Sequence, residues 1–231
     1  MNLAIIPARG GSKRIPRKNI KDFHGKPMIA YAIQVALNSK LFDHVVVSTD
    51  DVEIAHIAKS YGAQIPFMRP DTLADDFTDT VSVVAHAIEH VDFLDMHEIK
   101  QSTACCVYPC SPLINESDLQ KAMACLLSSS ADYCVPIVAF EHSIYRAMKI
   151  IDGKLSMLQP EQAKKRTQDL PVTYHDSGQF YFGRVEAWLK RRPILSGDAV
   201  PYVMARSHAV DIDTDEDWRM AERLYELSSR D

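Results

Sequence analysis

Short apolar runs alternate with helix-patterned segments along most of this chain, and this alternation limits the possible folds more than any other feature. Buried strands are expected at Leu3–Ile6, His44–Ser48, Ile65–Met68, Thr103–Tyr108 and Tyr133–Val138. Helices are expected between them at Met28–Leu37, Val52–Tyr61, Val81–His90 and Leu119–Leu127. Apolar strands joined by helices predict an α/β protein with a mostly parallel, doubly wound, Rossmann-like sheet.

The alternation is interrupted over about residues 140–176. That segment contains IIDGK, which is typical of a hairpin turn, and the polar run EQAKKRTQD. We interpret it as a small arm inserted into one domain that spans residues 1–231. The pattern then resumes with strands at Gln179–Phe182 and Ala209–Ile212, a helix at Val185–Lys190, and a final helix near Asp215 with Thr214 as its N-cap.

Composition argues against several classes of protein. The formal net charge is −5, whereas nucleic-acid binders usually carry a basic balance. No apolar run approaches the roughly 18 residues that a membrane-spanning helix needs, and the N-terminus MNLAIIPARGG lacks the features of a signal peptide. Five cysteines without a regular spacing favour free thiols. We therefore expect a cytoplasmic protein that binds neither nucleic acid nor membranes.

The loop after the first strand is rich in glycine and positive charge. It reads RGGSKRIPRKN from Arg9 to Asn19, with five Lys or Arg residues among the first ten. Adjacent glycines let backbone N–H groups turn toward an anion, and fixed cations beside them suit a triphosphate. The Walker A and G-x-G-x-x-G patterns are both missing, which argues against kinase-type ATPases and nicotinamide dehydrogenases. A solvated surface loop is the alternative, but ligands of parallel sheets bind beyond the carboxyl ends of strands, as here.

An acidic run near the C-terminus is the second candidate site. It reads VDIDTDED from Val210 to Asp217. On a strand, Asp211 and Asp213 share one face, and two carboxylates suit Mg²⁺, which also binds nucleotide phosphates. Acids that favour the start of a helix are the alternative, and they account for Asp215 to Asp217 but not for two acids in the preceding strand.

Together these motifs resemble a known family. The loop IPARGGSKRIPRKN resembles the signature of the acylneuraminate cytidylyltransferases, which activate nonulosonic acids with CTP, and DIDTDEDW resembles their metal-binding D-x-D and last helix. RPDTLADD, the stretch Pro109–Leu113 and SGQFYFGR are further matches, so the resemblance spans nearly the whole chain. GSKRIPRKN and GQFYF are most similar to the branch that acts on pseudaminic acid. Tyr108 stands where neuraminate enzymes carry a glutamine.

The resemblance implies a Mg²⁺-dependent transfer of CMP from CTP to an acidic nine-carbon sugar. It implies nucleotide binding by Arg9, Gly11, Ser12, Lys13, Lys18, Asn19 and Arg69, and metal binding by Asp211 and Asp213. Sugar binding would fall to Tyr108, Ser111, Gln179 and Tyr181, and catalysis to Arg9, Lys18 and Asp211. It also implies a homodimer in which the arm brings Lys164, Lys165 or Arg166 to the partner's sugar carboxylate.

Several alternatives remain open at this point. The sugar could be neuraminate, legionaminate or 3-deoxy-manno-octulosonate, and the chain could be a non-catalytic nucleotide-binding regulator or a structural oligomerisation protein. Arg69 could be an ordinary surface residue, and Gln179 and Tyr181 could be packing residues.

Overall fold

The computed structural model describes residues 1–92 and 101–228. Within them, seven strands form one sheet in the order β11-β6-β10-β5-β1-β4, with β9 also paired to β6. These strands are β1 (Asn2–Pro7), β4 (His44–Ser48), β5 (Thr103–Val107), β6 (Tyr133–Ala139), β9 (Tyr174–Asp176), β10 (Phe180–Arg184) and β11 (Ala199–Val203). β1 is parallel to β4 and β5, β11 is parallel to β6, and β10 is antiparallel to both of its neighbours. The predicted mainly parallel sheet is therefore confirmed.

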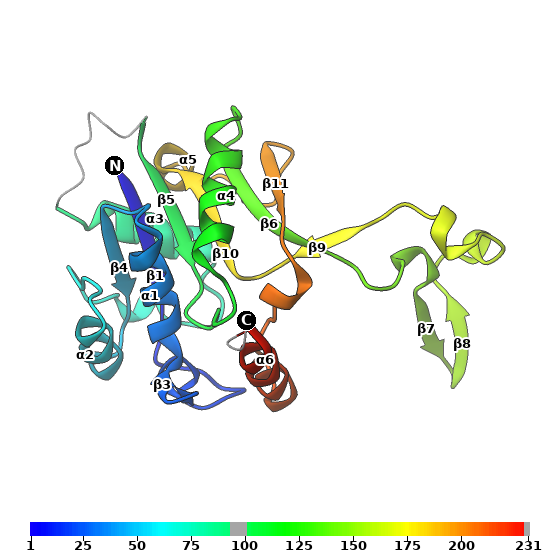
Figure 1. The fold of residues 1–231 in the computed structure, drawn as a ribbon, viewed down its shortest axis with the longest axis horizontal. Coiled ribbons are helices and arrows are strands. Elements are labelled where there is room, and N and C mark those ends of the chain that lie inside the picture. The colour runs from blue at the N-terminus through cyan, green and yellow to red at the C-terminus, as the bar shows by residue number, and fades with distance from the viewer. Residues whose placement is uncertain (93–100, 229–231) are drawn as a thin grey trace.

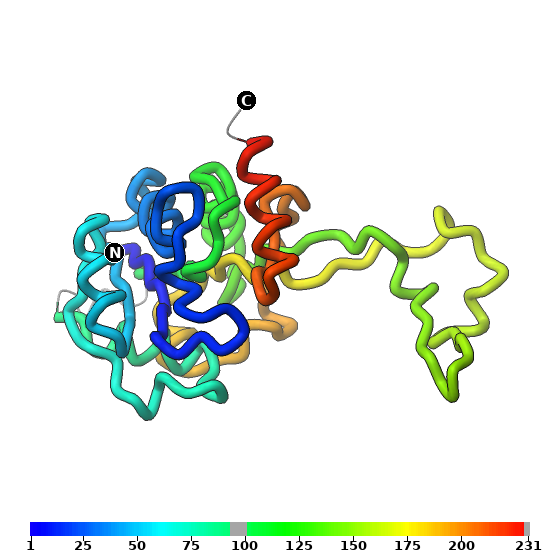
Figure 2. Tube along the Cα trace, turned by 90° about the horizontal axis from the view of Figure 1, so that it is seen from below, coloured from blue at the N-terminus to red at the C-terminus, as the bar shows by residue number. Residues whose placement is uncertain are grey.

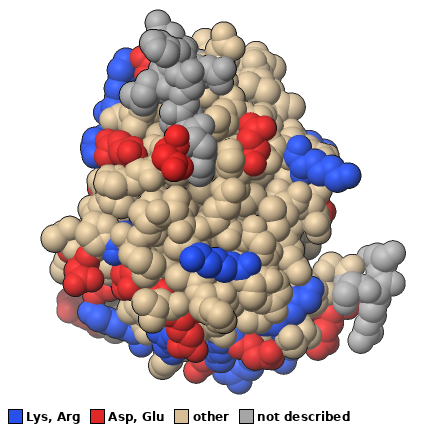
Figure 3. All heavy atoms as spheres, turned by 90° about the vertical axis from the view of Figure 1, so that its left-hand side faces the viewer, with Lys and Arg blue, Asp and Glu red and all other residues tan. Residues whose placement is uncertain are grey.

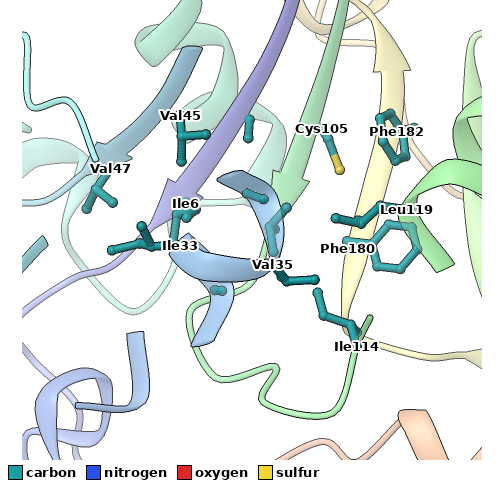
Figure 4. Packing of buried hydrophobic residues seen from close by; sticks show 14 of the residues in the cluster. Ile6, Ile33, Val35, Val45, Val47, Cys105, Ile114, Leu119, Phe180 and Phe182 are labelled. Atoms are coloured by element: carbon teal, nitrogen blue, oxygen red, sulfur yellow. The ribbon is translucent and has the colours of Figure 1, made fainter. Parts of the chain in front are cut away.

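Helices cover both faces of the sheet (Figure 1). They are α1 (Met28–Ser39), α2 (Val52–Ser60), α3 (Thr80–Glu89), α4 (Glu116–Leu127), α5 (Val185–Leu189) and α6 (Asp215–Ser228). Residues of α1, α2 and α4 share one hydrophobic core with the sheet, and residues of α3 and α5 share another on the opposite face. Figure 4 shows part of the first core, where Ile6 and Phe180 of the sheet pack with Ile33 of α1 and Leu119 of α4. The doubly wound arrangement is confirmed.

A third core fixes α6 beside the first loop. The short strands β2 (Asp22–Phe23) and β3 (Lys26–Pro27) form a hairpin after that loop. The Phe23 ring meets Tyr31 of α1 and Trp218 of α6 edge-on, with ring centroids 5.4 and 5.5 Å apart. Ile15 of the glycine-rich loop and Ile212 of the acidic run are buried in the same cluster. The glycine-rich loop and the acidic run are therefore anchored in the same hydrophobic cluster.

The predicted arm leaves the body of the molecule after β6 and returns at β9 (Figures 1 and 2). At its far end, β7 (Met148–Ile151) and β8 (Lys154–Met157) form a hairpin. Its two-residue turn is Asp152-Gly153, with φ of 50° and 74°. Asp-Gly is favoured in such turns because both positions need positive φ, so the hairpin expected from IIDGK is confirmed.

Two expected strands are wrong, and two strands of the main sheet, β9 and β11, were missed. Ile65–Met68 forms no strand: the neighbouring Gln64 makes only an isolated bridge to Val46, and Pro66 has no N–H to donate. Ala209–Ile212 also pairs with no strand of the described chain. The edge of the sheet is formed instead by β11, whose Pro201 hid it from a pattern-based search.

Helix termini follow the sequence closely. Asp51 caps α2 and Thr214 caps α6, where the Thr214 hydroxyl accepts a hydrogen bond from the Asp217 N–H at 3.2 Å. Short 3₁₀ turns lie at Lys18–Ile20, Asp71–Leu73, Ile144–Arg146, Pro160–Gln162, Thr167–Asp169 and Arg206–His208. Across the described ranges, no helix combines the length and the apolar character needed to cross a membrane. Basic and acidic side chains are interspersed over the face shown in Figure 3.

Candidate active site

A cleft of about 740 Å³ lies at the carboxyl ends of β1 and β5. Because β10 is antiparallel to β5, its first residues lie at the same edge of the sheet. Ten of the residues singled out from the sequence line this cleft: Arg9, Ser12, Lys13, Lys18, Asn19, Arg69, Tyr108, Tyr181, Asp211 and Asp213. The glycine-rich loop and the acidic run, almost 200 residues apart in sequence, thus face one shared cavity.

The glycine-rich loop is held in place by its backbone. The Gly10 N–H donates to Asp50 Oδ1 at 3.0 Å, and Asn19 Nδ2 donates to the Arg9 carbonyl at 2.9 Å. Gly10 is needed for close approach, because a Cβ there would lie 2.7 Å from Asp51 Oδ2. A Cβ on Gly11 would meet nothing within 4 Å. The loop is therefore packed closely against Asp51 at Gly10, whereas Gly11 has free space where a side chain would be.

Two cations of this loop are paired with a neighbouring acidic loop. Arg9 Nη1 lies 2.6 Å from Asp76 Oδ1 and also donates to the Asp75 carbonyl at 2.7 Å, and Lys13 pairs with Asp76 as well. Hydrogen bonds from Lys13 and Arg9 hold the pKa of Asp76 below its ordinary value. Asp75 and Asp76 were not identified from the sequence as site residues. The signal was present in RPDTLADD, whose two adjacent acids complement the cations of the first loop.

Asp211 and Asp213 both reach the cleft, but from a loop and not from a strand. Asp213 accepts a hydrogen bond from Arg14 at 2.6 Å and lies 3.6 Å from Lys18 Nζ, whereas the Asp211 carboxylate has no hydrogen bond or ion pair with any described residue. Asp211 reaches solvent, yet the cleft walls partly desolvate it and raise its pKa, and repulsion from Asp213 adds to that rise. A bound cation would relieve both effects.

The donor set fits a hard divalent cation. Mg²⁺ is commonly bound through one or two carboxylates, with phosphate oxygens and water completing its shell. In residues 1–92 and 101–228 no three His, Cys, Asp or Glu side chains come together as a metal site. A cation between Asp211 and Asp213 would therefore need further ligands from a bound nucleotide and from water.

Arg69 is a buried cation at the cleft wall. Its side chain is only 3% exposed, and its nearest acid is Asp50, 3.6 Å away. The Nε and Nη2 atoms have no hydrogen-bond partner among the described residues, and burial lowers the pKa of the guanidinium. A buried charge with unused donors is costly unless a ligand accepts them, so the surface interpretation of Arg69 is wrong.

Two tyrosines form an aromatic part of the cleft wall. The Tyr108 and Tyr181 rings meet edge-on with centroids 5.8 Å apart, and burial raises the pKa of both phenols. The Tyr108 hydroxyl lies 2.6 Å from Thr80 Oγ1, and the Tyr181 hydroxyl donates to Asp176. Thr80 and Asp176 also line the cleft and were not identified from the sequence, because neither belongs to a recognisable motif.

Three of the expected site residues do not line the cleft: Gly11, Ser111 and Gln179. The Ser111 hydroxyl donates to the Gln179 carbonyl at 3.1 Å, and both residues are buried. Gln179 Nε2 donates to the carbonyls of Ser177 at 3.0 Å and Val210 at 3.1 Å. In this structure Ser111 and Gln179 therefore brace the wall of the cleft from behind.

The basic residues of the arm lie outside this cleft. Lys164, Lys165 and Arg166 follow the hairpin at the far end of the arm (Figure 1), and Arg166 forms an ion pair with Asp169 at 2.8 Å.

Comparison with known proteins gives a consistent result. A family model described as cytidylyltransferase matches residues 3–228. The chain is 42% identical over 228 residues to a pseudaminic acid cytidylyltransferase of Campylobacter jejuni, covering 98% of this chain and 97% of that protein. It is 30% identical over 234 residues to the CMP-N,N'-diacetyllegionaminic acid synthase of Legionella pneumophila, covering 98% and 97%.

The fold has solved counterparts. A CMP:2-keto-3-deoxy-manno-octonic acid synthetase complexed with CTP superimposes with a TM-score of 0.72 at 16% identity, covering 98% of this chain and 99% of that one. A 4-diphosphocytidyl-2C-methyl-D-erythritol synthase from Anaerococcus prevotii gives a TM-score of 0.62 at 15% identity, with 97% and 98% covered. At these identities the likeness concerns the fold alone.

Proposed function

This chain belongs to the cytidylyltransferase family, and on that premise we propose that it transfers CMP from CTP to pseudaminic acid and releases pyrophosphate. The observation that carries the proposal is the shared cleft, in which a cationic, glycine-opened loop faces the carboxylates of Asp211 and Asp213. A triphosphate needs such cations and backbone donors on one side and a metal-binding pair of acids on the other. The 42% identity to the Campylobacter protein supports pseudaminic acid as the sugar.

The loop side of the cleft would hold the nucleotide. Arg9, Lys13 and Lys18 provide positive charge for the phosphates, and Ser12 adds a hydroxyl donor. Binding requires Arg9 and Lys13 to exchange Asp76 for phosphate oxygens, since both now pair with that acid. The unused donors of Arg69, with Asn19 nearby on the loop, would meet the cytidine.

The transfer itself requires positioning more than covalent chemistry by the protein. The anomeric oxygen forms a bond to the α-phosphorus as the bond to pyrophosphate breaks, and side chains must hold the two in line. Mg²⁺ held by Asp211 and Asp213 would neutralise phosphate charge and lower the pKa of the attacking hydroxyl. Arg9 and Lys18 stabilise the charge that develops on the departing pyrophosphate.

We further propose that the arm forms a homodimer. Its hairpin exposes apolar side chains that the body does not cover, with Met148 61%, Ile150 75% and Leu155 73% exposed. Such a patch favours an interface with a second copy, which would also give Lys164 to Arg166 a route to the partner's cleft. Sedimentation should show a dimer for the wild type and a monomer for Ile150→Lys. A monomeric wild type would contradict this proposal.

We propose the cytoplasm as the compartment, because all five cysteines are free thiols. Legionaminate remains the second candidate sugar, on the strength of the 30% identity to the Legionella synthase.

The decisive experiment measures pyrophosphate release with CTP and Mg²⁺ against pseudaminic, legionaminic, neuraminic and 3-deoxy-manno-octulosonic acids. Turnover should be highest with pseudaminic acid. Asp211→Asn should lower it by about 100-fold or more at an unchanged unfolding midpoint. The matched control Asp215→Asn, on the first turn of α6 and outside the cleft, should stay close to the wild type. Release with none of the four sugars would refute the proposed function, and a fully active Asp211→Asn variant would refute the metal site.

A further inference from the structure

The aromatic part of the cleft contains a carboxylate that the proposed function leaves without a role. Asp176 is the last residue of β9, where it pairs with Ile137 of β6. It is half-buried and lines the cleft together with Tyr108, Gly178 and Tyr181. Its turn lies next to the acid pair, because a Cβ on Gly178 would be 3.9 Å from Asp211 Cγ.

The orientation of this carboxylate is fixed by two neutral donors. The Tyr181 hydroxyl donates to Asp176 Oδ2, and the Gly178 N–H donates to Asp176 Oδ1 at 3.0 Å. Gly178 adopts a φ of 65°, which allows the chain to turn its N–H back toward the acid. Each carboxylate oxygen has two acceptor sites, so one on each oxygen stays available to a ligand.

No cation compensates this charge. Among the described residues, Asp176 forms no ion pair with Lys, Arg or His, in contrast to Asp76 and Asp213 in the same cleft. A fixed anion without a counter-ion repels another carboxylate and favours O–H and N–H donors. A sugar bound here must turn its own carboxylate away from Asp176 and present hydroxyl or amide groups to it.

We propose that Asp176 determines sugar specificity by accepting a hydrogen bond from a hydroxyl or acetamido N–H of the sugar. The inference rests on the proposed function and adds the orientation of the substrate. The sugar carboxylate points away from Asp176, toward the cationic side of the cleft. The neighbouring rings of Tyr108 and Tyr181 form an apolar wall for the methyl groups of acetamido substituents.

The test separates the two substrates kinetically. Asp176→Ala should raise the KM for pseudaminic acid by about 10- to 100-fold, the usual effect of losing a hydrogen bond to a charged group. The KM for CTP should stay near its wild-type value, because Asp176 forms no hydrogen bond or ion pair with the loop from Arg9 to Asn19. The unfolding midpoint should fall modestly, because the Tyr181 hydroxyl and the Gly178 N–H lose their acceptor. Asp176→Asn keeps an acceptor oxygen and the size of the side chain. Its KM for pseudaminic acid should therefore lie between those of the wild type and Asp176→Ala. Asp198→Ala, an exposed acid outside this cleft, is the control.

Each other outcome overturns the inference in a recognisable way. A wild type that releases no pyrophosphate with any acidic sugar refutes the proposed function, and the inference with it. An active wild type with an unchanged sugar KM in both Asp176 variants refutes the inference alone. A fall in kcat at a constant sugar KM would mean that Asp176 acts on the reacting atoms instead of binding the sugar. A rise in the KM for both CTP and the sugar, together with a lower unfolding midpoint, would mean that its role is structural.

Discussion

Replacing either of the two adjacent glycines of the glycine-rich loop, Gly10 or Gly11, by alanine should have different effects. A Cβ on Gly10 would lie 2.7 Å from Asp51 Oδ2 and 3.1 Å from Asp51 Cβ, whereas one on Gly11 would meet nothing within 4 Å. Neither glycine has a positive φ, so backbone strain does not confuse the comparison. Gly10→Ala should therefore destabilise the fold, and Gly11→Ala should leave it intact.

The size of the effect follows from what Asp51 does. Its Oδ1 accepts hydrogen bonds from the N–H groups of Glu53 at 2.9 Å and Ile54 at 3.0 Å, and its Oδ2 accepts from Arg17. Losing such a cap costs about 0.5–2 kcal/mol, and overpacking costs about 1–3 kcal/mol. The two costs overlap, because moving the carboxylate relieves the clash, so we expect a loss of about 2 kcal/mol. In a chain of this length that lowers the Tm by about 4–8 °C.

Thermal unfolding of four variants measures this: Gly10→Ala, Gly11→Ala, Asp51→Ala and the double variant Gly10→Ala/Asp51→Ala. In the double variant the 2.7 Å contact is gone and only the 3.1 Å contact remains, so the added cost of Gly10→Ala should shrink by about 1 kcal/mol. Gly11→Ala should keep the wild-type Tm, because its methyl group would meet nothing within 4 Å.

Two results would refute this reasoning. A wild-type Tm for Gly10→Ala would show that the loop accepts the methyl group by moving away from Asp51. Strict additivity in the double variant would show that any destabilisation does not arise from the contact with the Asp51 carboxylate.

Three further predictions concern the same region. Lys18→Ala should lower turnover with CTP by about 100-fold or more, since a fixed cation is lost where charge develops; unchanged steady-state kinetics would make Lys18 a mere surface residue. Asp76→Asn should tighten CTP binding several-fold in calorimetry, because Arg9 and Lys13 lose a competing anion; equal or weaker binding would contradict that. The hydrogen bond from Arg17 lowers the pKa of Asp51 in the folded state. The ionised Asp51 side chain therefore contributes its full stabilisation above the pKa of about 3.9 that it has in the unfolded chain. This contribution is lost as the pH falls through the lowered pKa of Asp51 in the folded state. Urea unfolding of wild type and Asp51→Ala should converge at low pH, and a constant gap would count against it.

Two strands were predicted closely, and both are apolar runs whose residues are mostly buried. His44–Ser48 is identical in the expectation and in the structure, and Tyr133–Val138 differs from β6 by one residue. Two of the failures are Ile65–Met68, where Gln64 makes only an isolated bridge, and β11, an edge strand that contains Pro201.

The site was predictable where its chemistry is concentrated in one segment. The loop from Arg9 to Asn19 and the acids Asp211 and Asp213 stand out by residue type alone. The pairing of Arg9 with Asp76 was not predicted, because it joins two segments that are distant in the sequence. Asp176 had no signal of its own, since a single acid in a strand has no pattern.

The segment Ala209–Ile212 was expected to be a strand but is a loop, and its hydrogen bonds position the backbone next to Asp211 and Asp213. In a strand, the carbonyls of Val210 and Ile212 would be satisfied by a neighbouring strand. Here Gln179 donates to Val210 at 3.1 Å and Lys18 to Ile212 at 2.5 Å. Each carbonyl belongs to the residue just before a cleft carboxylate, so these two side chains hold the backbone next to the acids. Because Lys18 belongs to the phosphate-binding loop, a triphosphate that draws it away also frees the Ile212 carbonyl. If the proposed sites are right, nucleotide binding and the geometry of Asp211 and Asp213 should therefore be coupled through Lys18.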